Sequence, residues 1–280
     1  MKTPPALALA CFQIAAYSQT VPYPDEGPAV FVWRILSVGE AQRDTFVACL
    51  AKNDLPFWRD LKKKGLLAKV SVFETTAVDG SKPGVPAWNF VVSTEVAAAD
   101  SFLQAVEKRK ACDSAPGIEL RRIETLKTTP NAHYARATVE GDRIAREKKV
   151  EFRIEYIAVD PAKLDRWNEL YSTTVGPAAG SVIQSGSSFS ADALLTVKVN
   201  YSQPGMPAWN CIHVLGGFPR AQRGALDAAI RQISPGIGSF RELMAQGGFP
   251  LPQDQPVGFH SFVTNRRNDS VRQLFDLALR

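Results

Sequence analysis

The 280-residue chain has few cysteines and no paired metal-binding motif. No two of its four cysteines form a CxxC pair, which argues against a structural zinc site. Removal of the N-terminal segment described below would leave Cys49, Cys112 and Cys211. Cys49 and Cys112 fall on two predicted helices of one repeat, and a disulfide between them would suit an oxidising compartment. Because the sequence does not give the Cα separation, the favoured interpretation is three buried free thiols.

Short motifs that mark common enzyme classes are also missing. The chain has no GxSxG nucleophile elbow, no HExxH zinc motif and no phosphate-binding P-loop. Gly236-Ile237-Gly238 lacks the third glycine and the preceding strand of a dinucleotide-binding fingerprint. The sequence therefore assigns no reaction, and whether the protein is an enzyme stays open.

Charge of one sign is not concentrated anywhere in the chain. The net charge is +5, and the basic residues come in short groups scattered along the sequence. A nucleic-acid surface gathers its basic side chains on one face, so no nucleic-acid partner is expected. Beyond the first 19 residues no stretch is apolar enough for the ~20 residues that span a bilayer, so no integral membrane segment is expected in the mature chain.

The N-terminus has the features of a secretory signal. Lys2 precedes an apolar stretch from Ala6 to Ala16, and Ala16-Tyr17-Ser18 offers a small-x-small cleavage site. Residues 1–18 are therefore predicted to be a signal peptide, and the protein is expected to be periplasmic or secreted. If the segment is instead an ordinary disordered N-terminus, the protein would be cytoplasmic.

A seven-residue phrase occurs twice in the chain. Residues 83–89 read PGVPAWN and residues 204–210 read PGMPAWN. The same spacing, with no gap, pairs Phe31 with Phe152, Val38 with Val159, Asp44 with Asp165, Gly65 with Gly186, Thr75 with Thr196, and Val78 with Val199. A self-match at fixed spacing indicates an internal duplication. Two structurally similar repeats are therefore predicted.

Hydrophobic alternation, helical periodicity and turn residues predict the order β-α-β-β-α-β in each repeat. The first repeat is expected to cover residues 29–128 and the second residues 150–267, joined by a polar connector at 129–149. Residues 268–280 are predicted to form a short amphipathic helix that Asp269 or Ser270 caps.

Two such units in one chain resemble the fused form of the dimeric α+β barrel superfamily. The expected fold class is α+β, with two tandem ferredoxin-like repeats that together form a barrel. The resemblance implies two facing sheets around a cavity, helices outside, and a monomer that is an internal pseudo-dimer. The superfamily includes cofactor-independent monooxygenases, haem-binding enzymes, isomerases and stress-responsive proteins without known activity. The fold therefore implies a place for a ligand and does not imply a reaction.

Charged residues on the first strand of each repeat are candidate ligand-binding residues. If the apolar face of each strand contacts the helices, Arg34, Arg153 and Glu155 look into the barrel. There they could grip an anionic or carbonyl-bearing ligand, since arginine makes bidentate contacts. The favoured alternative is a structural ion pair between the repeats, or charges at a wet rim.

The repeated phrase supplies four further candidates. Trp88 and Trp209 are interpreted mainly as core anchors, and Asn89 and Asn210 as ties between the Pro-Gly loop and the following strand. The alternative is that one Trp-Asn pair lines the cavity and stacks on a ligand.

Two histidines complete the set of candidates. His213 and His260 each occur in only one repeat, and either could be an acid–base group or a haem ligand. A lone histidine on a strand is nevertheless more often a hydrogen-bonded core residue. The expected cofactor is therefore none, with haem as a minor alternative.

Together these features favour an exported, small-molecule-binding α+β barrel of unknown ligand. One alternative is a cofactor-independent oxygenase or isomerase that acts on a small enolisable substrate. Another is a non-catalytic interaction protein whose barrel is filled by its own side chains.

Overall fold

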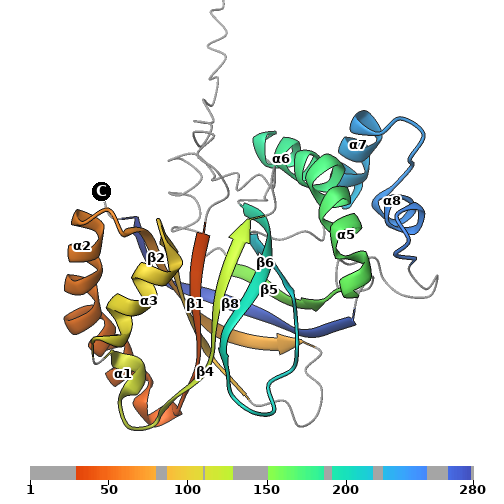
Figure 1. The fold of residues 1–280 in the computed structure, drawn as a ribbon. Helices are drawn as coiled ribbons and strands as arrows, with labels where there is room; N and C mark the ends of the chain where they lie inside the picture. Colours follow the sequence, from red (N-terminus) through yellow and green to blue (C-terminus); the bar gives the residue numbers. More distant parts are fainter. Residues whose placement is uncertain are drawn as a thin grey trace, which may run out of the picture.

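The computed structural model describes residues 30–79, 87–109, 111–128, 151–185, 191–216, 223–250 and 264–278. The predicted signal peptide, the connector at 129–149 and His260 lie outside these residues. Within them the chain forms two similar halves, each a sheet with helices on its outer face (Figure 1).

The described elements of the first half are β1 (Val30–Val38), η1 (Glu40–Gln42), α1 (Arg43–Cys49), η2 (Leu50–Asp54), α2 (Leu55–Lys63), β2 (Leu67–Asp79), β3 (Phe90–Val96), α3 (Ala99–Glu107), η3 (Cys112–Ser114) and β4 (Ile118–Thr128). Those of the second half are β5 (Glu151–Ala158), η4 (Pro161–Lys163), α5 (Leu164–Leu170), η5 (Tyr171–Val175), α6 (Gly176–Gln184), β6 (Ala191–Ser202), β7 (Cys211–Gly216), α7 (Arg223–Ile233), α8 (Phe240–Gln246) and β8 (Thr264–Ala278).

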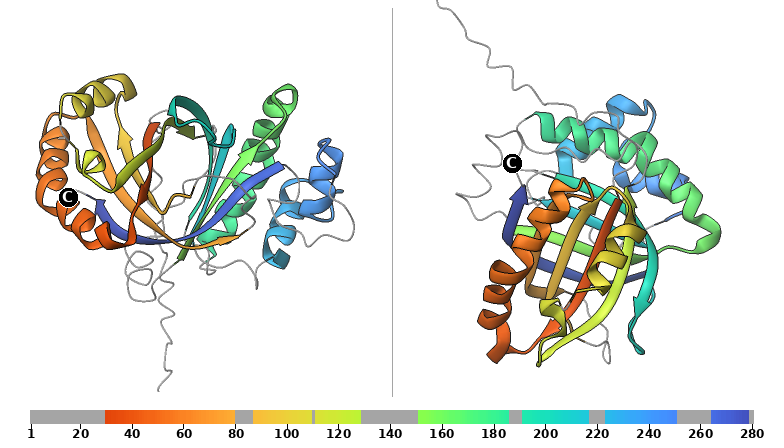
Figure 2. Two further views of the ribbon diagram at one scale, coloured as in Figure 1. Left: turned by 90° about the horizontal axis from the view of Figure 1, so that it is seen from below. Right: turned by 60° about the vertical axis from the view of Figure 1, so that its left-hand side comes forward.

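The strands close into one barrel in the order β1-β3-β2-β8-β5-β7-β6-β4. The last strand of each half joins the two sheets: β4 pairs with β1 and with β6, and β8 pairs with β5 and with β2. The helices of the two halves lie on opposite sides of this barrel (Figure 2). The predicted fold class, a fused α+β barrel of two ferredoxin-like repeats, is confirmed.

The predicted C-terminal helix is wrong, because residues 264–278 form strand β8. An isolated amphipathic helix of a dozen residues is marginal in water. As a strand, the same segment pairs on both sides, and Val271 is fully buried against the barrel core. Barrel closure therefore decides the conformation of this segment.

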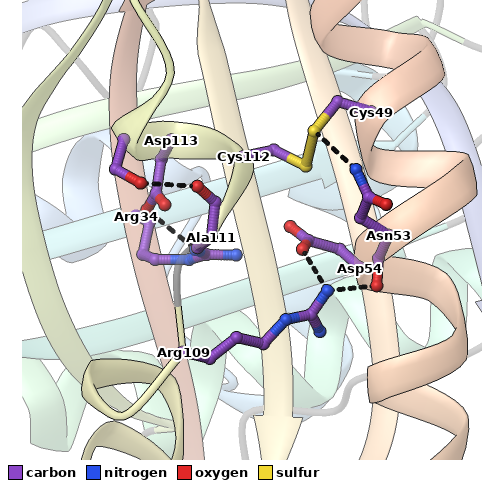
Figure 3. Close-up of a disulfide and its surroundings, with 9 residues drawn as sticks. Arg34, Cys49, Asn53, Asp54, Arg109, Ala111, Cys112 and Asp113 are labelled. Carbon is purple, nitrogen blue, oxygen red and sulfur yellow. Dashed lines mark hydrogen bonds and ion pairs between the residues drawn. A yellow bond between two sulfur atoms is a disulfide. The ribbon is translucent and has the colours of Figure 1, made fainter.

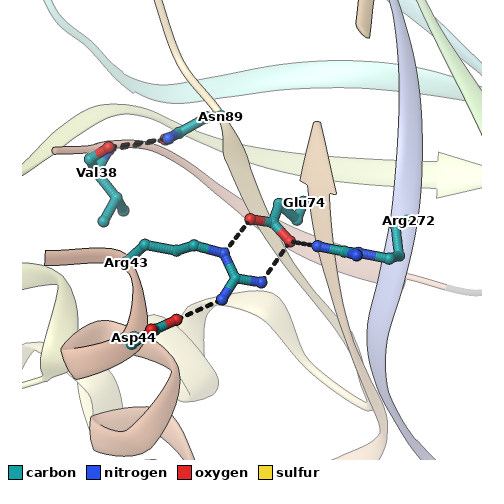
Figure 4. A network of polar contacts seen from close by, with 6 residues as sticks. All are labelled: Val38, Arg43, Asp44, Glu74, Asn89 and Arg272. Carbon is teal, nitrogen blue, oxygen red and sulfur yellow. Dashed lines mark hydrogen bonds and ion pairs between the residues drawn. The ribbon is translucent and has the colours of Figure 1, made fainter. Parts of the chain in front are cut away.

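A salt bridge network also links the two halves beside β8. Arg43 of α1 binds both carboxylate oxygens of Glu74 on β2, at 2.6 and 2.9 Å (Figure 4). Arg272 of β8 binds the same carboxylate at 2.5 Å. These bonds hold the pKa of Glu74 below its ordinary value, because the side-chain bond from Arg43 outweighs the effect of burial.

The structural alignment of the two halves contains a one-residue gap. The backbone N–H of Thr75 donates to the carbonyl of Asn89, and the N–H of Val197 donates to the carbonyl of Asn210. Thr75 therefore corresponds to Val197, not to Thr196, and the second half contains one extra residue between α6 and β6. A one-residue shift moves side chains to the other face of a strand, so faces cannot be assigned across β2 and β6 from the fixed spacing.

Both faces of the first strands are buried, and their predicted assignment is reversed. Phe31, Trp33 and Ile35 of β1 point into the barrel, where they pack in the same core as Ile154 and Tyr156 of β5. Arg34 and Glu155 point outward toward the helices. The prediction failed because the barrel interior of this protein is as apolar as the space under the helices, so hydrophobicity does not distinguish the two faces.

Cys49 and Cys112 form a disulfide between the end of α1 and η3, with Cα atoms 5.9 Å apart (Figure 3). The interpretation of three free thiols is therefore wrong for this pair. Cys211 is free and buried, as expected. Within the described part of the chain, every helix is too short or too polar to cross a membrane.

Candidate functional site

Three aromatic rings meet in the middle of the barrel. Tyr156 contacts Trp88, with ring centroids 5.3 Å apart, and Trp209, with centroids 5.0 Å apart. The two tryptophan rings lie 5.8 Å from each other. All three side chains are buried. The two repeated tryptophans thus meet across the pseudo-symmetric interface and occupy the barrel core.

Each tryptophan is held by an arginine–carboxylate pair on a strand of the other half. Arg122 and Glu124 of β4 form a 2.5 Å bond, and the Arg122 guanidinium lies 3.8 Å from the centre of the Trp209 ring. Arg267 and Asp269 of β8 form an equivalent 2.5 Å bond, with Arg267 3.6 Å from the Trp88 ring centre. We call these two pairs the Trp209 clasp (Arg122, Glu124) and the Trp88 clasp (Arg267, Asp269).

Sequence reasoning missed both clasps. Their signal is an Arg-x-acid triplet on the last strand of each half, Arg122-Ile123-Glu124 and Arg267-Asn268-Asp269. The spacing between these triplets differs from that of the repeated phrase, because the second half is longer before its last strand. A search at fixed spacing therefore does not align them.

The two clasps differ in how many of their carboxylate oxygens accept a hydrogen bond. In the Trp88 clasp, Asp269 Oδ1 accepts from Arg267, and Oδ2 accepts from Trp88 Nε1 at 3.1 Å. In the Trp209 clasp, Glu124 Oε1 accepts from Arg122, while Oε2 has no hydrogen-bond partner among the described residues. Burial raises the pKa of Glu124 to about 7, although Arg122 opposes the shift. Trp209 Nε1 lies near enough to lower this pKa without reaching hydrogen-bond geometry.

Asn89 and Asn210 have matching structural contacts. Each amide exchanges two 2.8 Å hydrogen bonds with the backbone at the end of the first strand of its half. Asn89 bonds Val38 in this way (Figure 4), and Asn210 bonds Val159. Each asparagine thus ties the repeated phrase to the first strand, not to the strand that follows it. The oxygen and the nitrogen of each side-chain amide are therefore both used in hydrogen bonds to the backbone.

A small cavity of about 20 Å³ lies inside the barrel, against β1, β2 and β3. Phe31, Trp33 and Phe73 form its aromatic wall, and Ser71 and Ser93 add hydroxyl groups. Lys69 and Glu95, which are cross-strand partners on β2 and β3, also line it. A cavity of this size holds about one water molecule. None of the eight side chains that were predicted to bind a ligand and lie in the described part of the chain lines it.

A second polar cluster lies outside the barrel, under the helices of the second half. His213 on β7 bonds Glu155 through Nδ1 at 3.0 Å and Asp192 through Nε2 at 2.6 Å. Tyr171 of η5 donates to Asp192 at 2.7 Å. All four side chains are buried, and we call them the His213 cluster. Two of its members, His213 and Glu155, were predicted from the sequence.

The corresponding positions of the first half are mostly apolar. By strand pairing they are Arg34, Val70 and Val92, and by the fixed spacing of the repeat Leu50 of η2 corresponds to Tyr171. Leu50, Val70 and Val92 are buried core residues. The fold therefore does not require a polar cluster here. Burial alone would lower the pKa of His213, but Asp192 and Glu155 outweigh it and raise the pKa to about 9. The imidazole is therefore charged at neutral pH.

Arg34 lies in a different environment from Glu155. Its guanidinium bonds Asp113 of η3 at 2.7 Å, beside the Cys49–Cys112 disulfide and the 3.1 Å ion pair of Arg109 with Asp54 (Figure 3). Arg153 is half-buried on the helix-facing side of β5. The expected meeting of Arg34, Arg153 and Glu155 inside the barrel does not occur. The ion pair of Arg34 is with Asp113 of its own half, so the predicted pairing between repeats is also wrong for this residue.

Comparisons with known proteins support the fold and give no family. No protein-family model matches the chain, and no curated protein matches it. Among solved structures, a protein classed as a dyp-type peroxidase from Shewanella oneidensis superposes with a TM-score of 0.52 at 8% identity, over 89% of this chain and 93% of that one. A chlorite dismutase from Candidatus Nitrospira defluvii gives 0.44 at 8% identity, over 90% and 93%. A protein classed as a monooxygenase from Lactobacillus acidophilus gives 0.42 at 12%, over 90% and 96%.

These similarities correct the cofactor prediction. The expectation of no cofactor, with haem as a minor alternative, is contradicted, because the dyp-type peroxidase that shares this fold belongs to a class of haem-binding proteins.

The described residues do not present an open haem site. Both ring nitrogens of His213 are bonded to carboxylates, so neither is free to ligate iron. The space between its strand and the helices is filled by a hydrophobic core that includes Trp167, Tyr171 and Phe240. In the described ranges, no group of three or more His, Cys, Asp or Glu side chains could hold a metal ion. A histidine ligand would have to be His133 or His260, outside those ranges.

Proposed function

We propose that this protein is a small-molecule-binding α+β barrel in which a ligand enters and widens the barrel cavity beside Trp33, which without a ligand has room for about one water molecule. The observation that carries the proposal is the set of polar side chains around a cavity in a largely apolar barrel core. Ser71 and Ser93 are buried there, next to Phe31 and Phe73. An apolar pocket with a few convergent polar groups is the usual form of a small-molecule site.

The fold supports the same function. Solved structures that share it include a chlorite dismutase in complex with cyanide and another in complex with imidazole, as well as the dyp-type peroxidase class. Haem is therefore the first cofactor to test on this chain. Its binding would be separate from the barrel cavity, because a volume near 20 Å³ cannot hold a porphyrin.

The test is a thermal-shift screen of the mature protein with small carbonyl compounds, phenols and haemin. A ligand at a hundredfold excess over its Kd stabilises the native state by about 2.7 kcal/mol. In a chain of this size that raises Tm by roughly 5–10 °C. Haemin is also followed by its Soret absorbance, which separates specific ligation from general stabilisation.

Two variants locate the site. Ser93→Leu fills the cavity and is expected to abolish the shift caused by a small ligand. Ala77→Leu adds the same bulk at an exposed position of β2 and should leave the shift unchanged. Absence of any ligand-induced shift, or an equal shift in Ser93→Leu, would refute binding in the cavity.

Export is part of the same proposal. The Cys49–Cys112 disulfide is of the kind that persists in oxidising compartments, which agrees with the signal-like N-terminus. Cell fractionation with mass analysis of the N-terminus is expected to find the chain outside the cytoplasm and cleaved after residue 18. Recovery of an uncleaved chain from the cytoplasm would exclude export.

A further inference from the structure

The disulfide between Cys49 and Cys112 joins the helices of the first half to a short connection before β4. We call this connection, residues 111–115, the η3 segment, because η3 forms most of it. The carboxylate of Asp113, in the same segment, binds the buried guanidinium of Arg34 on β1 at 2.7 Å (Figure 3). One covalent bond and one ion pair, on adjacent residues, thus attach the η3 segment to the helical layer and to β1.

A buried carboxylate near the disulfide is incompletely satisfied. Asp54, at the end of η2, is only 2% exposed, yet neither of its oxygens accepts a hydrogen bond of normal geometry from the described residues. Arg109 lies 3.1 Å from Oδ1 as an ion pair. Burial raises the pKa of Asp54, although Arg34, Arg109 and the backbone of Cys112 oppose the shift. A buried charge without hydrogen bonds costs free energy, so access of water to this carboxylate would stabilise it.

The fold does not require a disulfide or a buried charge at this place. By the fixed spacing of the repeat, Leu170 corresponds to Cys49 and Val175 to Asp54, and both lie in the hydrophobic core of the second half. The second half therefore closes the same place with apolar contacts. The first half has instead a bond that a reductant can break and a charge that gains hydration when the bond is broken.

The sulfur of Cys49 is the more accessible end of the disulfide. Cys49 is half-buried, whereas Cys112 is only 3% exposed. The side-chain amide of Asn53 donates a hydrogen bond to Cys49 Sγ at 3.3 Å (Figure 3). A hydrogen-bond donor favours the thiolate form of a cysteine, and an accessible thiolate is its reactive form. Cys49 is therefore placed to exchange with an external thiol.

We propose that the Cys49–Cys112 disulfide is a redox-sensitive switch that opens and closes the η3 segment. A dithiol reductant attacks the Cys49 sulfur with one thiolate, and Cys112 leaves as a thiolate that takes up a proton. The second thiol of the reductant then resolves the mixed disulfide, which releases Cys49 as a thiol and leaves the reductant as a disulfide. Two electrons and two protons pass from the dithiol to the protein. In an oxidising compartment the segment stays closed until such a dithiol reaches Cys49.

Hydration of the buried charges favours the open segment once the covalent bond is gone. When η3 moves away, water reaches Asp54 and Arg34, and this gain offsets the loss of the ion pair with Asp113. The pairing of β1 with β4 involves neither cysteine, so the barrel stays closed during this local opening. Arg34 faces the helices while its neighbour Trp33 lines the barrel cavity, so the inference stands independently of ligand binding.

The experiment is native-state thiol labelling of the mature protein before and after reduction with dithiothreitol. The reductant is removed without air, iodoacetamide is added, and the modified cysteines are identified by mass spectrometry. In the reduced protein we expect Cys112 to react within about tenfold of the rate of Cys49, because labelling follows the population of the open form. Cys211, buried in the second half, reports global unfolding and should react about a hundredfold more slowly than Cys112.

Substitutions of Asp54 test whether the buried carboxylate favours opening. Asp54→Val introduces the residue that the second half has at this position, and in the reduced variant Cys112 should react about tenfold more slowly than in the reduced wild type. Asp54→Asn removes the charge and nearly keeps the shape, should slow the reaction in the same direction, and decides the outcome if Asp54→Val does not fold. Asp60→Val, at an exposed position of α2, is the matched control and should leave the labelling rate unchanged.

Three results would overturn the proposal. Protection of Cys112 equal to that of Cys211 in the reduced protein would mean that the η3 segment stays closed without the disulfide. Labelling of Cys211 at the rate of Cys112 would mean that reduction unfolds the whole chain. Equal labelling of Cys112 in the wild type, Asp54→Val and Asp54→Asn would mean that the buried carboxylate does not favour opening. None of these results bears on ligand binding in the barrel cavity.

Discussion

Single side chains decide whether equivalent positions of the two halves are apolar or charged. The sequence identified His213 as a residue without a counterpart, and this asymmetry is the strongest signal that it offered. Asp192 and Tyr171 could not be added to it from the sequence, because the extra residue before β6 shifts the face of Asp192 and because Tyr171 lies on the helical layer. The unpaired oxygen of Glu124 is likewise a property of geometry, not of residue type.

The His213 cluster makes a testable contribution to stability. The pKa of His213 is raised from 6.5 to about 9 on folding, so its stabilising effect is complete below pH 6.5 and is lost as pH rises toward 9. At about 1.4 kcal/mol per pKa unit, the loss should amount to roughly 3–4 kcal/mol. Urea unfolding between pH 6 and pH 10 measures it. In His213→Gln the decline over this window should disappear, and a variant that keeps the wild-type slope would assign the decline to other groups.

At the scale of strands and helices, the local sequence pattern and the closure of the barrel compete to determine the conformation of a segment. Periodicity predicted most strands of both halves, because alternation and the Pro-Gly turns are local signals. It failed for β8, where residues 269–278 read as an amphipathic helix but pair with both β2 and β5. It also failed to orient β1, since a strand buried on both faces has no single apolar side.

The variant Ser270→Pro distinguishes a helical conformation of the C-terminal segment from the strand β8. In a helix capped at Asp269, position 270 would be the first helical residue, where proline is well tolerated. In β8, Ser270 pairs with Ala77 on one side and Arg153 on the other, so proline would disrupt a central strand. We expect a loss of about 3 kcal/mol or more in denaturant unfolding. Ser270→Ala, which keeps the backbone N–H, should lose well under half of that, and equal stability of the two variants would contradict the strand.

At the scale of the whole molecule, the two halves depend on each other through their last strands. β4 completes the sheet of the second half and clasps Trp209, while β8 completes the sheet of the first half and clasps Trp88. The duplication in the sequence predicted two halves and a shared barrel. It did not predict this exchange of clasps, because each clasp residue contacts a tryptophan far away in the sequence.

This exchange predicts the behaviour of the first half expressed alone as residues 29–128. Without β8, strand β2 has an unpaired edge, and without β6 so does β4, while Trp88 loses Arg267 and Asp269. Unpaired strand edges favour association with another chain. We therefore expect a homodimer in which β4 of each copy pairs with β2 of the other, as light scattering and size-exclusion chromatography would show. Adding Trp88→Ala, which removes a ring from the centre of that barrel, should weaken the dimer. A folded monomer with cooperative unfolding would mean that each half is stable by its own core, and that the exchanged strands are not required for folding.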